Sequence, residues 1–427
     1  GNTLNIGNKN LKAKNIYNFE TLNFKLPKGI SNNDKMLTLT DNRNTNLANT
    51  IIGIVLAGKP SLKYGDKVIL ISNETGKIDS QPDTPKVSAT DIAATYNFDI
   101  KVESNQQELT ATLLSTTQNP AQKNLAETTI AMGAVANTAA DVTEASGIKM
   151  AEGAAAMATS GSLGSFAGGD ISNTRHNSGS HVDAKGISLM AGVSSYIKDD
   201  LLLGAFLEFG KGNYNSYNSF NVKGSGDTRY YGIGALSKFD LKDNIYLEGS
   251  LRFGQIRSTY EGSGFNIAIN PTYKSKRAYI GTHIGVGKII DINDNSNIDL
   301  YTKLLYSRMA SDNVEINSYK YKFQAIDSLR AKLGTRYNYN INEVSKLYIG
   351  VAYEREFDSK AKAKNISANQ TIKAPSMKGN TYIGELGYRV DVAKTNKNGK
   401  VVFDFNLQGL AGKKEGVAGG VNLKWEI

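Results

Sequence analysis

The chain has 427 residues, no cysteine and a formal net charge of +10. A secreted protein without disulfides must be stabilised by a sheet or core of its own. The 50 Lys and Arg residues are spread along the chain without a run of five, which argues against the basic patch of a nucleic-acid-binding protein. No window approaches the ~20 apolar residues of a transmembrane helix, so a helical membrane protein is excluded and a membrane barrel is not.

The chain starts GNTLNIGNKN, without a basic and apolar leader, and we therefore expect a mature form or a fragment. Aromatic residues divide it into three regions. Only three of the 22 Tyr residues precede residue 170, and no aromatic residue lies between Phe98 and Phe166.

Region one, residues 1–118, contains short β-rich runs broken by Gly, Asn and Pro. These runs are IIGIVLAG (51–58), DKVILIS (66–72) and YNFDIKV (96–102). Short strands with Asn-rich turns are typical of a β-solenoid or its terminal cap, although the sequence has no clean repeat period.

Region two, residues 119–161, is rich in Ala, Glu, Met and Lys and has Pro120 at its start, which favours a helix. Its apolar residues are too sparse for a normal core-facing stripe, and most of its side chains are small. The region is either a flexible linker or a slim helix that fits a narrow space. We favour the helix because the strands predicted after residue 162 would enclose such a space.

Region three, residues 162–427, alternates apolar and polar residues over many segments, as in 245–254, 329–338, 347–354 and 403–408. This period of two is a strong strand signal. Most candidates are ~10 residues or longer, the length of a tilted membrane-crossing strand. The twelve predicted strands are at about 162–175, 182–197, 201–216, 227–240, 243–258, 273–291, 296–309, 322–341, 344–357, 377–393, 399–410 and 415–427.

A soluble sandwich also alternates, but twelve long strands in a meander favour closure into a barrel, which removes both edges. Tyr residues near strand ends fit girdles at a lipid–water boundary; these are Tyr214, Tyr217, Tyr230, Tyr231, Tyr337 and Tyr339. A barrel of this size has a lumen too wide for its own side chains to fill. A thin helix from region two would fill it.

Other motifs carry no chemistry that we could assign. GTHIGVGKI (281–289) lacks the spacing of a phosphate loop, and its glycines read as lumen-facing positions that leave room for a helix. His176 and His181 have no evident third partner for a metal. No nucleophile elbow or Ser-His-Asp order occurs. We therefore expect no cofactor, no metal and no enzymatic activity.

Three stretches resemble type V (type Va) autotransporters. GSFAGGDISNTRHNSGSHVDAKGISLMAGV (164–193) resembles the opening of the translocator barrel in that family, and 379–427 resembles its closing strands. KPSLKYGDKVILISNETGKI (59–78) resembles the C-terminal end of autotransporter passengers.

The resemblance implies an all-β fold: a 12-stranded antiparallel transmembrane β-barrel with a central α-helix in the pore, after a short β-solenoid-like passenger remnant. Residues 1–118 would be the passenger end, 119–161 the pore-spanning linker and 162–427 the translocator in a Gram-negative outer membrane. The implied function is export of the N-terminal passenger to the cell surface. The alternatives are a surface adhesin, an enzyme borne by a passenger outside this sequence, and a plain porin.

The implied partners are outer-membrane lipid, the barrel-assembly machinery, periplasmic chaperones and the protein's own passenger, with no nucleic acid and a monomeric barrel. The family usually ends in Phe or Trp, whereas this sequence ends in Ile with Trp two places earlier. The assembly signal would comprise Val421, Leu423, Trp425 and Ile427. Lumen-facing contacts to the helix would come from Glu248, Arg252, Arg330 and Arg336.

Some autotransporters cut their own pore helix at an Asn. The Asn–Asn pair of those members is absent from 121–160, which contains the lone residues Asn124 and Asn137. Asn137, which lies deeper in the predicted helix, is the candidate for self-cleavage.

Overall fold

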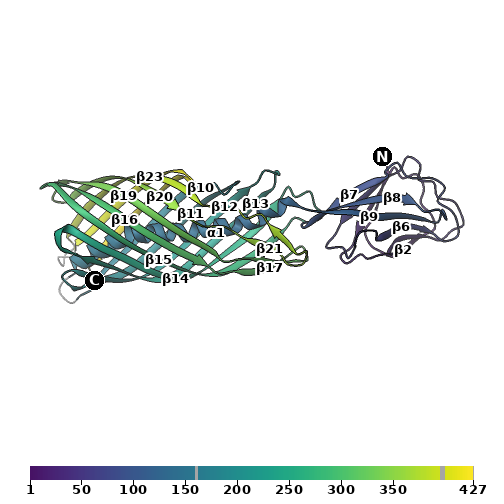
Figure 1. Ribbon diagram of the computed structural model, residues 1–427. Helices are drawn as coiled ribbons and strands as arrows, with labels where there is room; N and C mark the ends of the chain where they lie inside the picture. Colours follow the sequence, from purple (N-terminus) through teal and green to yellow (C-terminus); the bar gives the residue numbers. More distant parts are fainter. Residues whose placement is uncertain (159–161, 395–399, 427) are drawn as a thin grey trace.

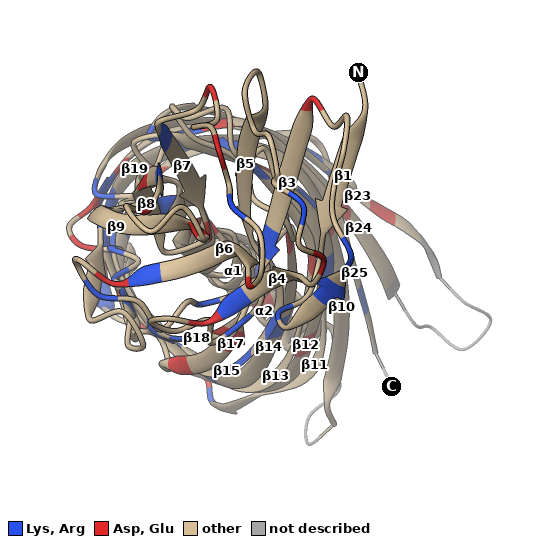
Figure 2. Cartoon of the chain, turned by 90° about the vertical axis from the view of Figure 1, so that its right-hand side faces the viewer, with Lys and Arg blue, Asp and Glu red and all other residues tan. Residues whose placement is uncertain are grey.

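The computed structural model describes residues 1–158, 162–394 and 400–426. The molecule is elongated: an N-terminal β-coil stands beyond one end of a barrel, and a helix runs from the coil into the barrel (Figure 1). In the end view of Figure 2, the helix lies inside the ring of strands. Within the described residues, the helix does not combine the length and apolar character needed to cross a bilayer.

The coil is built from two sheets. One joins β1, β3 and β5 in parallel, and the other joins β2, β4 and β6 in parallel and continues through antiparallel β9, β8 and β7. The bounds are β1 Thr3–Ile6, β2 Leu11–Ala13, β3 Thr21–Leu26, β4 Lys35–Leu39, β5 Ile51–Leu56, β6 Lys67–Asn73, β7 Lys86–Thr90, β8 Ala94–Val102 and β9 Glu108–Gln118.

The coil has rungs of unequal length, which explains the missing sequence repeat. Thr3, Thr21 and Ile51 are register partners in successive rungs, so the spacing is 18 residues and then 30. Apolar side chains fill the space between the sheets, with Leu22, Phe24 and Leu70 fully buried. Stacked rungs bury apolar surface that one rung alone cannot cover.

The helix begins at Pro120, as the sequence predicted. Asn119 precedes it, and its side-chain oxygen accepts a hydrogen bond from the Ala121 N–H at 3.0 Å. A 3-10 turn (Pro120–Gln122), α1 (Lys123–Val142), a π-helical turn (Thr143–Gly147) and α2 (Ile148–Met157) form one continuous rod. At ~1.5 Å per residue, its 38 residues span ~57 Å.

Twelve antiparallel strands close the barrel, with β25 pairing with both β24 and β10. This confirms the predicted strand number and helix-filled architecture. The strands are β10 Gly164–His176, β11 His181–Lys198, β12 Leu201–Tyr217, β13 Lys223–Asp240, β14 Ile245–Ser263, β15 Thr272–Asn293, β16 Ser296–Met309, β19 Ile326–Asn342, β20 Ser345–Glu356, β23 Gly379–Lys394, β24 Lys400–Gly412 and β25 Lys414–Glu426.

A second small sheet stands at the coil end of the barrel and was not predicted. It contains β17 (Asp312–Ile316), β18 (Tyr319–Phe323), β21 (Ala363–Asn365) and β22 (Gln370–Ile372). The prediction at 322–341 ran the end of β18 into β19. Both strands alternate apolar and polar residues, so periodicity alone could not separate them.

The predicted tyrosine girdle is wrong at two positions. Tyr231, Tyr337 and Tyr339 are 40–50% exposed, whereas Tyr214 and Tyr230 are buried. Adjacent residues of a strand point to opposite faces, so Tyr230 and Tyr231 cannot share one. Tyr214 and Tyr230 instead point into the lumen, toward the helix.

Candidate functional site: the helix-filled lumen

The lumen contains buried charged side chains. Arg252 and Arg277 are each 1% exposed, and both belong to strands whose alternate residues face outward. The helix carries four acidic residues and two lysines. Buried charges are stable only when they are paired and hydrogen-bonded.

The outer part of α1, nearest the coil, is held by hydroxyl groups. Tyr273 Oη donates to the Leu125 carbonyl at 2.5 Å, and Tyr260 Oη donates to Asn124 Oδ1 at 2.5 Å. Tyr214 Oη lies 2.7 Å from Thr128 Oγ1. These three contacts are neutral. Charged groups also take part here, since Arg277 Nη2 donates to Thr129 Oγ1 at 3.0 Å and Ser178 Oγ donates to Glu127 Oε2 at 2.8 Å.

Arg252 lies midway along the helix and contacts it directly. Its Nη2 donates to the Ala136 carbonyl at 3.2 Å, while its Nη1 pairs with Glu208 Oε2 at 2.9 Å. Tyr279 Oη also donates to Glu208. The wall thus supplies both the cation and its counter-ion.

Arg330 pairs with the helix at Asp141. Its Nη1 lies 2.5 Å from Asp141 Oδ1 and 3.1 Å from Glu354 Oε2. Lys414 Nζ joins the same two carboxylates, at 3.5 Å from Asp141 Oδ2 and 2.7 Å from Glu354 Oε1. Four charged groups therefore form a network around Asp141, and Lys332 Nζ, at 3.8 Å from Glu354 Oε2, extends it.

Glu144 occupies the π-helical turn and is only 3% exposed. Lys303 Nζ lies 2.8 Å from its Oε2, and Lys332 Nζ pairs with its Oε1. Lys303 and Lys332 come from the neighbouring strands β16 and β19 and are register partners. A π-helical turn often marks a functional position, and here it coincides with the doubly paired carboxylate.

Glu248 and Arg336 are lumen-facing, but their ion pairs run to the wall. Glu248 pairs with Lys303 at 2.6 Å and so reaches Glu144 only through that lysine. Arg336 forms a two-point contact with Glu385, with Nη2–Oε2 at 2.8 Å. These two residues therefore do not form the expected ion pairs with the helix. Each pairs with a residue of the barrel wall instead. Both line a cavity of about 20 Å³ beside Glu144 and Ala145.

Small residues allow the inner end of the helix to lie against the wall. A Cβ on Gly164 would come within 2.0 Å of the Ala154 carbonyl oxygen, and one on Gly153 within 2.8 Å of Lys424 Cδ. The glycines of 281–289 have a different partner from the predicted one. Cβ atoms on Gly281 and Gly285 would meet Arg252 and Glu248, so these glycines make room for wall side chains rather than for the helix.

The other predicted residues lie as follows. Asn137 is half-buried, and its Nδ2 donates to Ser328 Oγ at 3.2 Å while its Oδ1 accepts from Ser307 Oγ at 2.9 Å. Val421, Leu423 and Trp425 alternate with buried Asn422 and Lys424 on β25, so they face outward. Ile427 lies outside the described residues. His176 lies 3.0 Å from Thr174 Oγ1, and His181 stacks on Tyr217.

A contact that sequence reasoning missed fastens the helix at the coil end. We call it the latch: Asp91 of the coil, Gln122 of the helix, and Tyr319, Tyr321 and Asn365 of the small sheet. Tyr319 donates to Asp91. Gln122 Oε1 accepts from Tyr321 Oη at 2.8 Å and from Asn365 Nδ2 at 3.1 Å. No periodic signal links these residues, because the latch joins segments more than 190 positions apart.

Comparison with known families fixes the class of protein. The autotransporter beta-domain model matches residues 163–397, which is more than half of the chain. This chain belongs to the autotransporter family. Its barrel is therefore a type V translocator barrel of the outer membrane.

One solved structure agrees with that assignment at the level of fold. The translocator domain of the autotransporter NalP from Neisseria meningitidis is 13% identical, with a TM-score of 0.51, and the match covers 70% of this chain and 99% of that one. The transport unit of the autotransporter AIDA-I from Escherichia coli is also 13% identical, with a TM-score of 0.48 and coverage of 62% and 90%. No curated protein matches.

Proposed function

We propose that this autotransporter barrel exports the N-terminal part of its own chain to the cell surface and is then sealed by the helix. One observation carries the proposal. The helix continues directly from the coil, passes through the lumen and is ion-paired there at Asp141 and Glu144. A chain that leads from outside the barrel, through it, and into β10 has the topology of a completed export.

Burial of the helix supports the proposed seal. The small helix residues Ala126, Ala131 and Ala154 are at most 1% exposed. Wall side chains close the remaining space, since a tightly packed interior leaves no continuous path for water. The work of export is assigned to folding of the coil, whose stacked rungs bury apolar surface as they form.

Residues 1–118 are assigned as the end of the passenger, 119–161 as the pore-spanning linker and 162–427 as the translocator. No enzymatic role is proposed for any of them. Membrane insertion is assigned to the barrel-assembly machinery with periplasmic chaperones, and Val421, Leu423 and Trp425 on the closing strand supply an apolar face for recognition. Pairing of β25 with β10 completes the barrel.

The test of export uses an epitope tag placed before Gly1 in cells that express the full chain. Intact cells should bind the antibody and lose the tag on protease treatment. A control with Gly164→Leu changes a single residue at the start of β10 and crowds the helix path near Ala154. A tag that stays protected in intact cells, while the folded barrel is present in the outer membrane, would refute the proposal.

The seal is tested separately by conductance in planar bilayers. The full chain should give little current, and deletion of residues 120–157 should open a steady ion-conducting pore. Equal conductance with and without the helix would show that the helix does not plug the lumen.

A further inference from the structure

Four cationic side chains stand in one row on the exterior of the barrel. Lys211 is the register partner of Arg229, Arg229 of Arg257, and Arg257 of Lys276. All four are exposed. Adjacent strands lie ~4.8 Å apart, so this cation row is ~14 Å long. Like charges placed directly opposite one another destabilise a sheet, so the row requires an explanation.

The barrel does not neutralise the cation row. None of its four residues forms an ion pair within the described part of the chain. Arg257 donates only to the neutral Gln255, at 3.1 and 3.3 Å. Three of the four, with Lys274 and a single acid, Asp227, line a groove of about 470 Å³. The groove carries a clear excess of positive charge.

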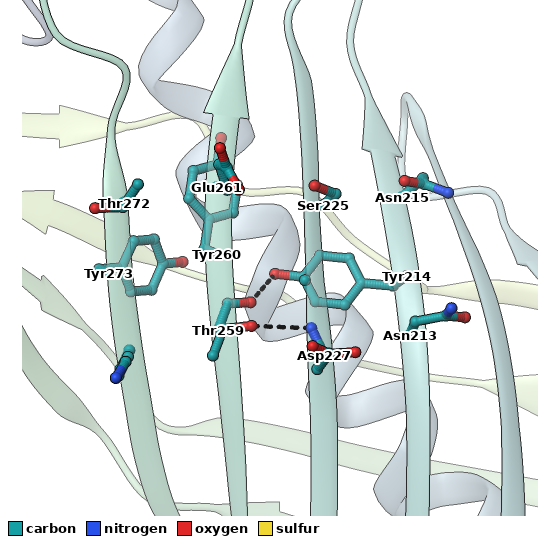
Figure 3. Close-up of a pocket in the computed structure, with 12 residues that line it drawn as sticks. Asn213, Tyr214, Asn215, Ser225, Asp227, Thr259, Tyr260, Glu261, Thr272 and Tyr273 are labelled. Atoms are coloured by element: carbon teal, nitrogen blue, oxygen red, sulfur yellow. Dashed lines mark hydrogen bonds between the residues drawn. The ribbon is translucent and has the colours of Figure 1, made fainter.

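Toward the coil end, the same strands carry mostly neutral polar groups, together with Asp227, Glu261 and Lys274. A groove of about 490 Å³ is lined by Asn213, Asn215, Ser225, Thr259 and Thr272, among others, and Figure 3 shows these side chains on four neighbouring strands with the helix behind them. The β13–β14 ladder is interrupted here, since register pairing stops at Ser225 and resumes at Thr228. Amide and hydroxyl groups of this kind suit a ligand that carries many hydroxyls.

In the other direction along the strands lies an apolar hollow of about 640 Å³ over β11–β14. Leu207, Ile233 and Phe253 line it and are 64%, 59% and 47% exposed. Leu207 is four residues from Lys211, or ~13 Å along β12. Three surfaces therefore follow one another on the same strands: apolar, cationic and polar.

We propose that this exterior strip binds a phosphorylated glycolipid of the outer leaflet. The acyl chains lie in the apolar hollow, the phosphates on the cation row and the sugar hydroxyls in the polar groove. Guanidinium groups bind phosphate oxygens through paired hydrogen bonds, which favours Arg229 and Arg257 as the phosphate contacts. If the coil end of the barrel faces outward, the apolar hollow lies deepest in the outer leaflet, the cation row lies above it, and the polar groove lies outermost.

The test uses the full chain in detergent and native mass spectrometry with diphosphorylated lipid A as the probe. The variant Arg229→Gln/Arg257→Gln/Lys276→Gln is compared with Lys198→Gln/Lys242→Gln/Lys288→Gln, which removes three exposed charges at the opposite rim. Each lost cation near an anionic lipid costs ~1 kcal/mol, so the first variant should bind about 100-fold more weakly. The control should bind like the wild type.

Three further arms identify the source of the phosphate. Monophosphoryl lipid A should bind more weakly than the diphosphorylated form, and phosphatidylglycerol should not distinguish the two variants. Inorganic phosphate at the same concentration should not displace lipid A. Both variants must show the folded-barrel mobility on unheated gels. An equal loss in both variants, or wild-type binding of phosphatidylglycerol as strong as that of lipid A, would overturn the proposal.

Discussion

The two halves of the pore helix are held by different chemistry. Outside Ala136, the wall offers tyrosine hydroxyls to Asn124, the Leu125 carbonyl and Thr128. Inside it, the wall offers cations to Asp141, Glu144 and Glu152. A neutral hydrogen bond contributes ~1 kcal/mol, whereas an unpaired buried charge costs several. We therefore expect the neutral contacts of the outer half to break and re-form one at a time, and the ion-paired contacts of the inner half to break together.

The largest effect is expected from Glu144→Gln. It removes the carboxylate shared by the buried Lys303 and Lys332, which then keep only Glu248 at 2.6 Å and Glu354 at 3.8 Å, and breaking a buried pair on one side costs up to ~3–5 kcal/mol. We expect a lower free energy of unfolding, measured by urea titration in lipid vesicles, and frequent channel openings in bilayers.

Glu152→Gln is the matched control for Glu144→Gln. Glu152 is 34% exposed, and its partner Lys238 keeps Asp240 at 2.8 Å when Glu152 is neutralised. The loss should be well below that of Glu144→Gln. Equal losses would contradict the idea that enclosure at the π-helical turn sets the strength of the inner half.

An intermediate effect is expected in the outer half from Tyr273→Phe, which removes the hydroxyl that donates to the Leu125 carbonyl. The ring stays packed, so the loss should be ~1 kcal/mol in the same urea titration, without steady channel opening. Tyr231→Phe, on the lipid side of the barrel, is the control. A loss as large as that of Glu144→Gln would show that the two halves are held equally.

The sequence predicted the barrel more fully than the contacts inside it. Alternation over residues 162–427 was enough to predict twelve strands, because the alternation within each strand indicates which residues face inward and which face outward. The same parity placed Arg252 and Arg330 in the lumen. It could not assign partners, since Glu248 and Arg336 have the same inward parity but pair with Lys303 and Glu385.

The helix partners were missed for a related reason. Asp141 and Glu144 stand three residues apart, a spacing that places two side chains on neighbouring positions of a helix. That spacing predicts a charged face on the helix, but it does not predict which strands lie opposite that face. The latch left no local pattern at all, because it depends on how the small sheet packs against Gln122.

A smaller, pH-dependent effect is expected at the latch. Burial raises the pKa of the Asp91 carboxyl, against the hydrogen bond from Tyr319 and the N–H groups of Ala93 and Ala94, with Lys59 nearby as the opposing charge. Burial also raises the pKa of Tyr96 to about 12, so this phenol stays protonated near neutral pH.

The sign of the Asp91 effect follows from its raised pKa. The closed latch binds a proton more tightly than the open one, so it is most stable in acid and loses that stability as pH rises through the raised pKa. We expect fewer channel openings near pH 4 than near pH 7, and Asp91→Asn should remove much of the difference. A pH dependence that is unchanged in Asp91→Asn would place the titrating group elsewhere.

The smallest effect is expected at Asn137, which lies at the boundary between the two halves. Self-cleavage there requires the side-chain amide to attack its own main-chain carbonyl carbon. In the structure, that amide donates to Ser328 instead, and its oxygen accepts from Ser307. We therefore expect N-terminal sequencing and intact mass to show the same uncut chain for the wild type and Asn137→Ala. A cut after residue 137 in the wild type alone would restore self-cleavage and mean that the wall serines release the amide during the reaction.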